Sequence, residues 1–313
     1  MAKLGKNINF ASLTSNKNMR KKKFALFGNV YQAKKSVSVQ KLLSLLAERG
    51  AEVYIDAGFY HYLVDDMRLD VTAAGLIEGD DFDVDFVVSM GGDGTFLEAA
   101  RRVGAKGTPI LGINTGRMGF LADVSADEID TAIEQLYAGN YSIGSRSVLQ
   151  LSYSEGHPEG YPYALNEVAV LKRHNSSMIS IRVDVNGRYL TTYQADGLII
   201  NTPTGSTGYA LSVNGPILAP GSETLGVVAV APHTLNVRPI VLRDDVTIDL
   251  TVESRTDNFL VSLDGRSETC HEGIRLHLQR APYNINVVHR PDGSFFHTLR
   301  NKLMWGSDVR ERV

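Results

Sequence analysis

The sequence predicts an α/β N-terminal domain with a parallel sheet, then a β-rich, sandwich-like domain, then a C-terminal helix that packs back on the first domain. Two observations predict this division. Up to about residue 145, apolar strand-like runs alternate with amphipathic helical runs, which is typical of a parallel sheet. Beyond that point, strand-like runs follow one another with turn residues between them and few helical windows, which indicates an all-β unit.

We expect four segments along the 313 residues: a disordered basic leader at 1–20, the α/β domain at 21–145, the all-β domain at 146–290 and the helical return at 291–313. Residues 1–23 contain seven Lys and Arg and no Asp or Glu. The remainder therefore has 25 basic against 35 acidic residues, a net charge of −10. Such an acidic body argues against nucleic acid as a partner.

Other bulk properties of the sequence indicate the cellular compartment. The single cysteine, Cys270, excludes a disulfide framework and favours a reducing compartment, so we expect a cytoplasmic protein. No apolar run is long enough to span a membrane, and Lys and Asn interrupt the N-terminal segment where a secretory signal would be apolar.

In the first domain, each expected element is an apolar or amphipathic run that stops at glycine or polar residues. The run 36–49 has apolar residues at 39, 42, 43, 45 and 46 and is followed by Gly50, which predicts a helix. Ser125 and Glu128 form a capping-box pattern that predicts a second helix, to residue 137. The expected strands are 23–27, 52–55, 86–90 and 109–113.

In the second domain, Asn186-Gly187 separates two strand-like runs and predicts a type I′ hairpin. Residues 154–162, rich in Ser, Gly, Pro and Glu, predict an exposed hairpin loop, and 294–305 predicts the last helix. The expected strands are 163–171, 178–185, 188–193, 197–201, 227–231, 246–252, 259–263, 274–278 and 285–288.

The glycine turn after the strand at 86–90 is the most informative motif. It reads Gly91-Gly92-Asp93-Gly94-Thr95 and leads into an amphipathic run. Glycines let a ligand approach the backbone, and the helix N-terminus that follows suits a phosphate. A carboxylate there makes sense if it accepts a proton, binds a hydroxyl or holds a metal beside the phosphate. The turn therefore indicates phosphoryl transfer.

Two further segments are candidate sites. Asp196 to Tyr209 is a strand that runs into a loop dense in Thr, Ser and Gly, which could bind sugar or amide groups, with Tyr209 stacking on a base. It could equally be a long polar turn with a backbone network of its own hydroxyls. Asn166-Glu167 interrupts an apolar strand and could grip the two hydroxyls of a ribose, or be an outward-facing polar step.

Several site classes are excluded. The chain has no Gly-x-x-x-x-Gly-Lys-Ser/Thr phosphate loop and no Gly-x-Ser-x-Gly elbow. Gly112, Gly116 and Gly119 have the wrong spacing for a dinucleotide-binding Gly-x-Gly-x-x-Gly. No His/Cys cluster indicates zinc.

Together these segments resemble the NAD kinase family, over about residues 23–305. The glycine turn alone is shared with phosphofructokinases and with diacylglycerol and sphingosine kinases, whereas the order and spacing from Asp196 to Tyr209 are far more specific. The segments that carry the resemblance are Gly91 to Thr95, Gly112 to Leu121, Asn166-Glu167, Asp196-Gly197 with Pro203 to Tyr209, and Ala231 to Leu235.

The resemblance implies that ATP and NAD react to give ADP and NADP, the phosphoryl group going to the 2′-hydroxyl of the adenosine ribose. It also implies a homodimer or homotetramer with NAD bound between the domains and at a subunit contact. A divalent cation, usually Mg²⁺, is needed and comes with ATP, and no residue of this chain is assigned as its ligand.

The family's functional positions carry over residue by residue. Asp93 becomes the proton acceptor, Gly94 lies against the substrate, and Gly91, Gly92 and Thr95 form the phosphate loop. Asn166 and Glu167 contact the ribose and diphosphate, and Asp196 contacts the nicotinamide end. The remaining substrate-binding positions, which hold the adenine and nicotinamide parts, are Thr207, Gly208, Tyr209, Ala210, Leu211, Ser212 and Ala231.

Two positions depart from the family pattern. Many members have Gln where this chain has Arg266, and a basic residue often stands where it has Gln194. Charge alone suggests four phosphate partners, each more simply interpreted as a solvated surface charge or a member of an ion pair: Arg101, Arg102, Arg117 and Lys172. Two other functions stay open on the residues: a lipid kinase of the diacylglycerol or sphingosine type, and a non-catalytic NAD or NADP sensor.

Overall fold

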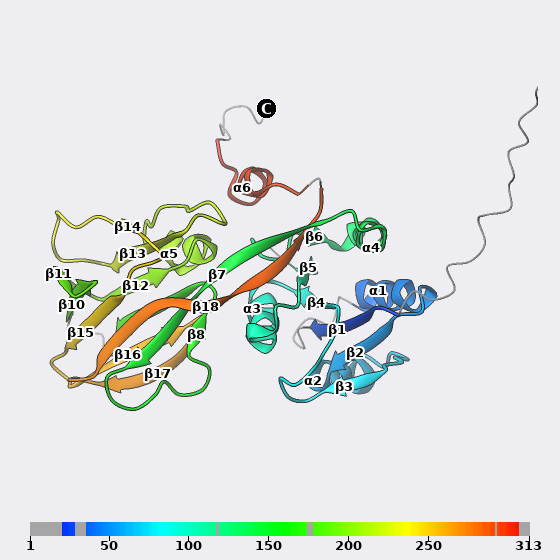
Figure 1. Cartoon of the computed structure of the whole chain (residues 1–313), viewed down its shortest axis with the longest axis horizontal. Helices are drawn as coiled ribbons and strands as arrows, with labels where there is room; N and C mark the ends of the chain where they lie inside the picture. Colours follow the sequence, from blue (N-terminus) through cyan, green and yellow to red (C-terminus); the bar gives the residue numbers. More distant parts are fainter. Residues whose placement is uncertain (1–20, 29–35, 117–118, 174–177, 292, 307–313) are drawn as a thin grey trace, which may run out of the picture.

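The computed structural model describes residues 21–28, 36–116, 119–173, 178–291 and 293–306. Figure 1 shows a half with helices on both sides of a sheet, a half made almost wholly of strands, and two long strands that run between them. One sheet has 12 strands and the other has six. The predicted leader at 1–20 lies outside the described residues.

The first half contains a parallel sheet, as predicted. The order β3-β2-β1-β4-β5 is parallel throughout, and β6 is added beside β5. The four strands expected from the sequence are confirmed to within a residue at each end, and β3 and β6 are additional. The strands are β1 (Lys23–Gly28), β2 (Glu52–Asp56), β3 (Gly75–Ile77), β4 (Phe86–Gly91), β5 (Ile110–Asn114) and β6 (Val124–Ser125).

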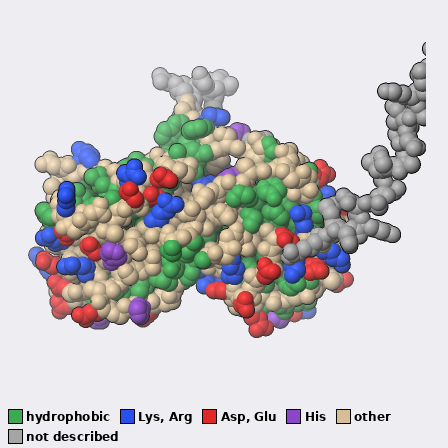
Figure 2. All heavy atoms as spheres, viewed as in Figure 1, with side chains coloured by type: hydrophobic (Ala, Val, Ile, Leu, Met, Phe, Trp, Pro, Cys, Tyr) green, Lys and Arg blue, Asp and Glu red, His purple; other side chains and the backbone are tan. Residues whose placement is uncertain are grey.

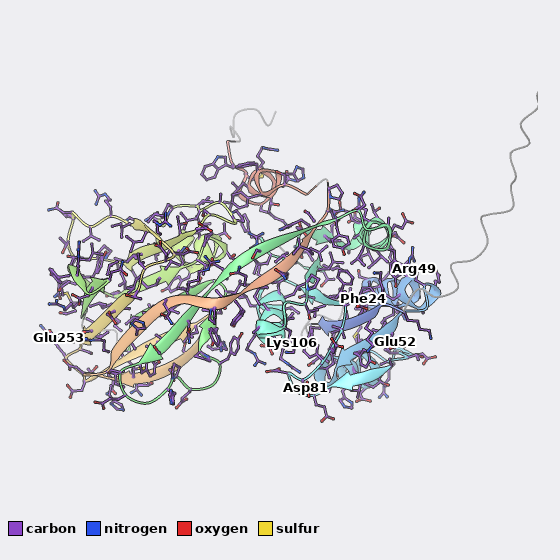
Figure 3. The ribbon with its side chains drawn as sticks, in the orientation of Figure 1. Phe24, Arg49, Glu52, Asp81, Lys106 and Glu253 are labelled. Carbon is purple, nitrogen blue, oxygen red and sulfur yellow. The ribbon has the colours of Figure 1, made fainter. Side chains whose placement is uncertain are left out.

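Helices cover both faces of this sheet. Alternate residues of β1 face opposite sides: Phe24 (labelled in Figure 3) packs with the core under α1 and α4, whereas Phe27 packs with the core under α3. The predicted capping box is present, since the Ser125 N–H donates to Glu128 at 3.0 Å. The helices are α1 (Ser36–Glu48), α2 (Ala57–His61), α3 (Asp93–Val103) and α4 (Ile129–Ala138), with a π-helical turn at Tyr62–Asp66.

Two long strands tie the halves together. β7 (Ser142–Tyr153) and β18 (Arg275–His289) pair antiparallel along most of their length and cross the middle of Figure 1. At its C-terminal end β18 pairs parallel to β5, Val287 opposite Ile110. The larger sheet therefore continues from the first half into the second, through β15 (Ile248–Glu253), β10 (Ile179–Val185) and β11 (Arg188–Ala195).

The second half is a β-sandwich, as predicted. Its smaller sheet is antiparallel in the order β14-β13-β12-β9-β16-β17. One apolar core joins the two sheets, with Ile181 and Leu250 from the larger and Leu198 and Phe259 from the smaller. The remaining strands are β8 (Tyr163–Ala164), β9 (Glu167–Lys172), β12 (Gly197–Asn201), β13 (Thr224–Val230), β14 (Ile240–Arg243), β16 (Asn258–Leu263) and β17 (Arg266–His271).

Turn chemistry accounts for two local features. Asn186 and Gly187 both have positive φ, +50° and +72°, so the predicted I′ hairpin between β10 and β11 is confirmed. The strand expected at 163–171 is divided instead: β8 ends at Ala164 and β9 begins at Glu167. This break carries a candidate site.

The last helix is confirmed as α6 (Phe295–Leu303), which projects above the crossing strands in Figure 1. Phe295 and Phe296 line a cavity of about 430 Å³ together with Phe120 of the first half and Thr204 of the second. Figure 2 shows the molecule hollowed below this helix and both signs of charge interspersed over the face in view. The helix thus lies over the junction of the two halves.

Candidate active site

The glycine turn has the predicted strand–turn–helix form, with β4 ending at Gly91 and α3 beginning at Asp93. A Cβ on Gly91 would lie 2.1 Å from the Thr95 hydroxyl oxygen, so the turn can close on its own helix only with glycine there. A Cβ on Gly92 or Gly94 would meet no described atom within 4 Å. Open space beside two glycines at a helix N-terminus suits an anionic ligand.

The carboxylate of Asp93 is held by backbone from another loop. The Phe120 N–H donates to Oδ2 at 2.8 Å and the Leu121 N–H donates to Oδ1 at 2.9 Å. Gly119 lies so close that a Cβ on it would be 2.4 Å from Oδ1. Each carboxylate oxygen accepts one N–H and keeps a further lone pair, so the group is fixed in position and can still accept a proton.

Asn166 and Glu167 lie at the break between β8 and β9. Within the described part of the chain, Asn166 Oδ1 and Glu167 Oε2 are buried and have no hydrogen-bond partner. Burial, and then the charge of Asp264, raise the pKa of Glu167 from 4.5 to about 7, although the Tyr209 N–H opposes the shift. Unsatisfied buried acceptors and a raised carboxyl pKa are typical of a binding or catalytic site.

The loop at 202–209 packs directly on this pair. Thr202 donates its N–H to the Asn166 carbonyl at 2.9 Å and its hydroxyl to the Leu165 carbonyl at 2.6 Å. A Cβ on Gly205 would lie 2.1 Å from the Asn166 carbonyl oxygen, and one on Gly208 would lie 3.0 Å from Glu167 Oε2. Glycines at these two positions let the loop approach the strand break.

The hydroxyls of this loop bond to its own neighbouring backbone. Those of Thr202 and Ser206 are buried and donate to backbone carbonyls, as the alternative interpretation of the loop expects. Thr207 is half-buried, and its hydroxyl donates to the Thr204 carbonyl at 3.3 Å. Tyr209, at the start of α5 (Tyr209–Ser212), is 36% exposed, so its ring is the group that the loop leaves open to a ligand.

The remaining predicted positions of this stretch differ in exposure. Ala210 is fully buried in a small core with Ile199 and Val228, so its side chain faces away from any cleft. Leu211 is half-buried and packs less deeply. Ser212 is exposed, and its hydroxyl donates to the Tyr209 carbonyl at 2.7 Å.

Two cavities are lined by residues of both halves. In the smaller, of about 110 Å³, Gly94 of α3 lies opposite Leu165 and Asp264. In the larger, Phe120 and Leu121, which hold Asp93, lie opposite Thr204 and Thr207. Asp93, the strand break and the 202–209 loop thus form one candidate site at the junction.

Asp196 and Ala231 lie elsewhere in the chain. Asn201, at one end of β12, pairs with Glu167, whereas Asp196 precedes the other end, a separation of about 16 Å along the strand. The Asp196 N–H bonds to Val230, next to Ala231, and its carboxylate forms an ion pair with Lys172 at 2.8 Å. These two predicted positions form a second cluster, apart from the first.

The other basic candidates are ion-pair members, as expected. Arg101 pairs with Glu98 at 2.6 Å, and Arg102 pairs with Asp56 at 3.1 Å. Arg117 lies outside the described residues. Gln194 donates to the Ser180 hydroxyl at 2.7 Å.

One residue of the site region was not predicted from the sequence. By composition Asp264-Gly265 is an ordinary turn, yet the Asp264 carboxylate accepts the N–H groups of Leu165, Asn166 and Glu167. The available signal was the Asp-Gly hairpin pair between two strand-like runs. Nothing in the local pattern says which strand such a turn will touch.

The described residues include no group of three His, Cys, Asp or Glu side chains placed to hold a metal ion. A Mg²⁺ bound mainly through substrate phosphates needs no such group. Among the helices that the structure describes, none has the length and apolar character to cross a membrane.

Comparison with known families accounts for both halves. Residues 12–141 match the model of the ATP-NAD kinase N-terminal domain, and residues 165–290 match that of the ATP-NAD kinase C-terminal domain. The NAD kinase of Bacteroides fragilis is 59% identical over 288 residues, 92% of this chain and 99% of that protein. The NAD kinase of Porphyromonas gingivalis is 42% identical over 289 residues, 92% of this chain and 100% of that protein.

Two solved structures share the fold. One is a yeast NADH kinase complexed with NADH, at 18% identity and a TM-score of 0.84, covering 94% of this chain and 90% of that one. The other is an NAD kinase from Archaeoglobus fulgidus in complex with ATP, at 24% identity and a TM-score of 0.71, covering 90% and 98%. The family matches over both halves, together with the NAD kinases at 59% and 42% identity, show that this chain belongs to the ATP-NAD kinase family.

Proposed function

We propose that the junction site transfers the γ-phosphoryl group of ATP to the 2′-hydroxyl of the adenosine ribose of NAD, with Asp93 as proton acceptor. As a member of its family, the chain is an NAD kinase that phosphorylates NAD with ATP, and this sets aside the lipid kinase and the non-catalytic sensor. The observation that carries the finer proposal is the fixed carboxylate of Asp93 beside the open flank of Gly94.

The proposed step forms one bond to phosphorus and breaks another. The ribose oxygen forms a bond to the γ-phosphorus while the bond between that phosphorus and the β–γ bridging oxygen breaks, which releases ADP. The hydroxyl proton goes to Asp93 and then to water. A ribose hydroxyl is a poor nucleophile, and proton acceptance late in the transition state contributes modestly to the rate. Most of the rate enhancement comes from positioning the reactants and neutralising charge.

Positioning is proposed to come from the second half. Asn166 and Glu167 would hold the ribose and diphosphate, because their unsatisfied buried acceptors match hydroxyl donors. Thr207, Gly208 and Tyr209 would hold the adenine and nicotinamide parts, with Tyr209 free to stack. Gly92 and Gly94, at the N-terminus of α3, would lie against the phosphates.

Mg²⁺ is proposed to enter bound to ATP. It would neutralise charge on the transferring phosphoryl group. The chain's own part is to keep the N-terminus of α3 open for that phosphate and to hold Asp93 beside it.

The complete site is proposed to need a second subunit, in a homodimer or homotetramer. Asp196 and Ala231 lie at the far end of β12 from Glu167, so within one chain they form a separate cluster from the residues proposed to hold the adenosine ribose. Residues 231–236 are all exposed, and Leu235 is 89% exposed. An apolar side chain this exposed beside predicted ligand positions fits a surface covered by another copy.

The test is a coupled assay in which NADP formed from Mg²⁺-ATP and NAD is read by an NADP-specific dehydrogenase. In Asp93→Asn we expect turnover to fall by about a hundredfold or more while NAD binding, measured by calorimetry, stays within about threefold. Asp127→Asn, at an exposed carboxylate of the first half, is the matched control. Full turnover in a folded Asp93→Asn protein would remove Asp93 from the proposed role.

A further inference from the structure

The tip of the hairpin between β16 and β17 reaches across to the strand break that carries Asn166 and Glu167. Asp264 and Gly265 form the tip, with φ of +48° and +84°. This conformation is accessible to Asp and easy for Gly, and it directs the Asp264 carboxylate inward. Burial raises the pKa of that carboxyl, so its inward placement opposes its own ionisation.

One carboxylate serves three consecutive peptide groups. Oδ2 accepts the Leu165 N–H at 2.7 Å, and Oδ1 accepts those of Asn166 at 2.8 Å and Glu167 at 3.0 Å. In return, Asp264 donates its own N–H to the Glu167 carbonyl at 3.1 Å. Leu165 and Asn166 belong to neither β8 nor β9, so the carboxylate replaces the bonds that a strand would supply.

Arg266 fixes the residues that lead into the same strand break. Its guanidinium donates to the Tyr161 carbonyl at 2.8 Å and to the Tyr163 carbonyl at 2.7 Å. It also stacks over the Tyr161 ring, 5.5 Å from the centroid. The side chain is therefore committed to residues 161–163, and Asp264 and Arg266 together fix the chain from 161 to 167.

We propose that Asp264 is a positioning residue for NAD phosphorylation, with Arg266 as its support: the hairpin tip fixes Asn166 and Glu167 where they meet the ribose and diphosphate of NAD. This inference rests on the proposed function of that pair. Asp264 touches no reacting atom and acts through the backbone it holds. Its negative charge beside Glu167 also favours the protonated form of that carboxyl, which can donate to a ligand oxygen.

A purely structural turn would behave differently. Substitutions in such a turn would lower the stability of the protein and the fraction that is folded. They would not change the KM of the folded enzyme. A positioning residue instead changes the KM for NAD selectively, and its effect depends on whether the residue it positions is present. Steady-state kinetics on folded protein therefore distinguishes a purely structural role from a positioning role.

The experiment measures KM for NAD and for ATP in Asp264→Asn, Glu167→Gln and the double variant. Asparagine turns an N–H donor toward backbone donors, so at least one charge-assisted bond is lost. We expect KM for NAD to rise about tenfold or more and KM for ATP to stay within about twofold. In the Glu167→Gln background the same change should raise KM for NAD by less than about threefold.

A matched control is available on the same strand. Asp257 precedes the other end of β16, is exposed and also has a positive φ, +56°. Asp257→Asn repeats the substitution in a turn remote from the break, and we expect wild-type KM values. If Asp264→Asn does not fold, Arg266→Met replaces it in the same cycle, since it removes both bonds to the carbonyls and keeps the apolar stem.

The outcomes distinguish a failure of the positioning role of Asp264 from a failure of the substrate-binding role of Glu167. An unchanged KM for NAD in folded Asp264→Asn, or in Arg266→Met where that variant replaces it, would overturn the positioning role, provided that Glu167→Gln raises this KM. An equal rise in both backgrounds would also overturn it. An unchanged KM in Glu167→Gln itself would overturn the substrate role of Glu167, and the positioning proposal with it.

Discussion

Asp93 and Leu121 are joined by a hydrogen bond of 2.9 Å from the Leu121 N–H to the Asp93 carboxylate, across 28 positions of sequence. Because the donor is a backbone N–H, no substitution at 121 other than proline removes it. The bond makes the loop after β5 a part of the catalytic apparatus proposed for α3. Residues that set the path of this loop should therefore affect turnover.

Gly119 provides the direct test of that relationship. In Gly119→Ala the new methyl would lie 2.4 Å from Asp93 Oδ1, so either the loop or the carboxylate must move. We expect kcat to fall about tenfold or more and the free energy of unfolding to fall by about 1–3 kcal/mol. Gly79→Ala, where the methyl would meet nothing within 4 Å, is the control. A wild-type kcat in Gly119→Ala would show that the position of Asp93 tolerates displacement.

Gly94 allows stability and activity to be separated. A Cβ there meets no described atom within 4 Å and φ is not positive, so Gly94→Ala fits the folded chain and improves the first turn of α3. We expect unfolding in guanidinium chloride to require about 0.5–1 kcal/mol more. If Gly94 lies against substrate, kcat/KM should nevertheless fall about tenfold or more, because the methyl occupies the ligand's space. A more stable enzyme with unchanged kcat/KM would contradict that placement.

The raised pKa of Glu167 predicts that the stability of the protein depends on pH. Burial and Asp264 raise its folded-state pKa to about 7, above the ordinary value of 4.5, while the Tyr209 N–H opposes the shift. The folded protein therefore holds a proton that the unfolded chain releases near pH 4.5. This contribution is complete below pH 4.5 and is lost as the pH rises through about 7.

Urea unfolding at pH 5 and pH 8 measures this contribution. Between the two, wild type should lose on the order of 2–3 kcal/mol more than Glu167→Gln, which does not titrate. An equal loss in the two proteins would mean that the pKa of Glu167 is not raised in the folded state.

The fold was predictable because its signals are local. The apolar run before Gly91 and the capping box at Ser125 are both set by residues within one turn or strand. The continuation of the larger sheet through β18 was not predictable, since it depends on Val287 pairing with Ile110, 177 positions earlier (287 − 110). Periodicity reports which face of a strand is buried and says nothing about its neighbours in a sheet.

The site divides in the same way. Asp93, Asn166 and Glu167 were found from residue types that conflict with their apolar surroundings, because such conflicts mark function. Asp264 was missed because a turn residue looks the same whether its carboxylate faces solvent or a strand 97 positions away. The distance between Asp196 and Glu167 was likewise invisible until strand pairing fixed it.

That distance leads to the last prediction, which concerns subunits. If Asp196 of one subunit completes the site that holds Asp93 of another, then Asp93→Asn and Asp196→Asn are each inactive alone for different reasons. Co-expressed with different tags and purified as mixed oligomers, they should regain activity, because some sites combine an intact Asp93 with an intact Asp196. In a purified heterodimer one of the two sites is intact, so we expect about one-half of wild-type activity, and about one-quarter in an unsorted, randomly assembled pool.

The matched control co-expresses Asp93→Asn with itself under both tags and should stay inactive. Pairing Asp93→Asn with Gly119→Ala should not restore activity by this route, because both changes fall on the same half of the site. Recovery in the first mixture alone would assign Asp196 to a neighbouring subunit. No recovery, in oligomers shown by mass to contain both variants, would place both carboxylates within one chain's site or remove Asp196 from it.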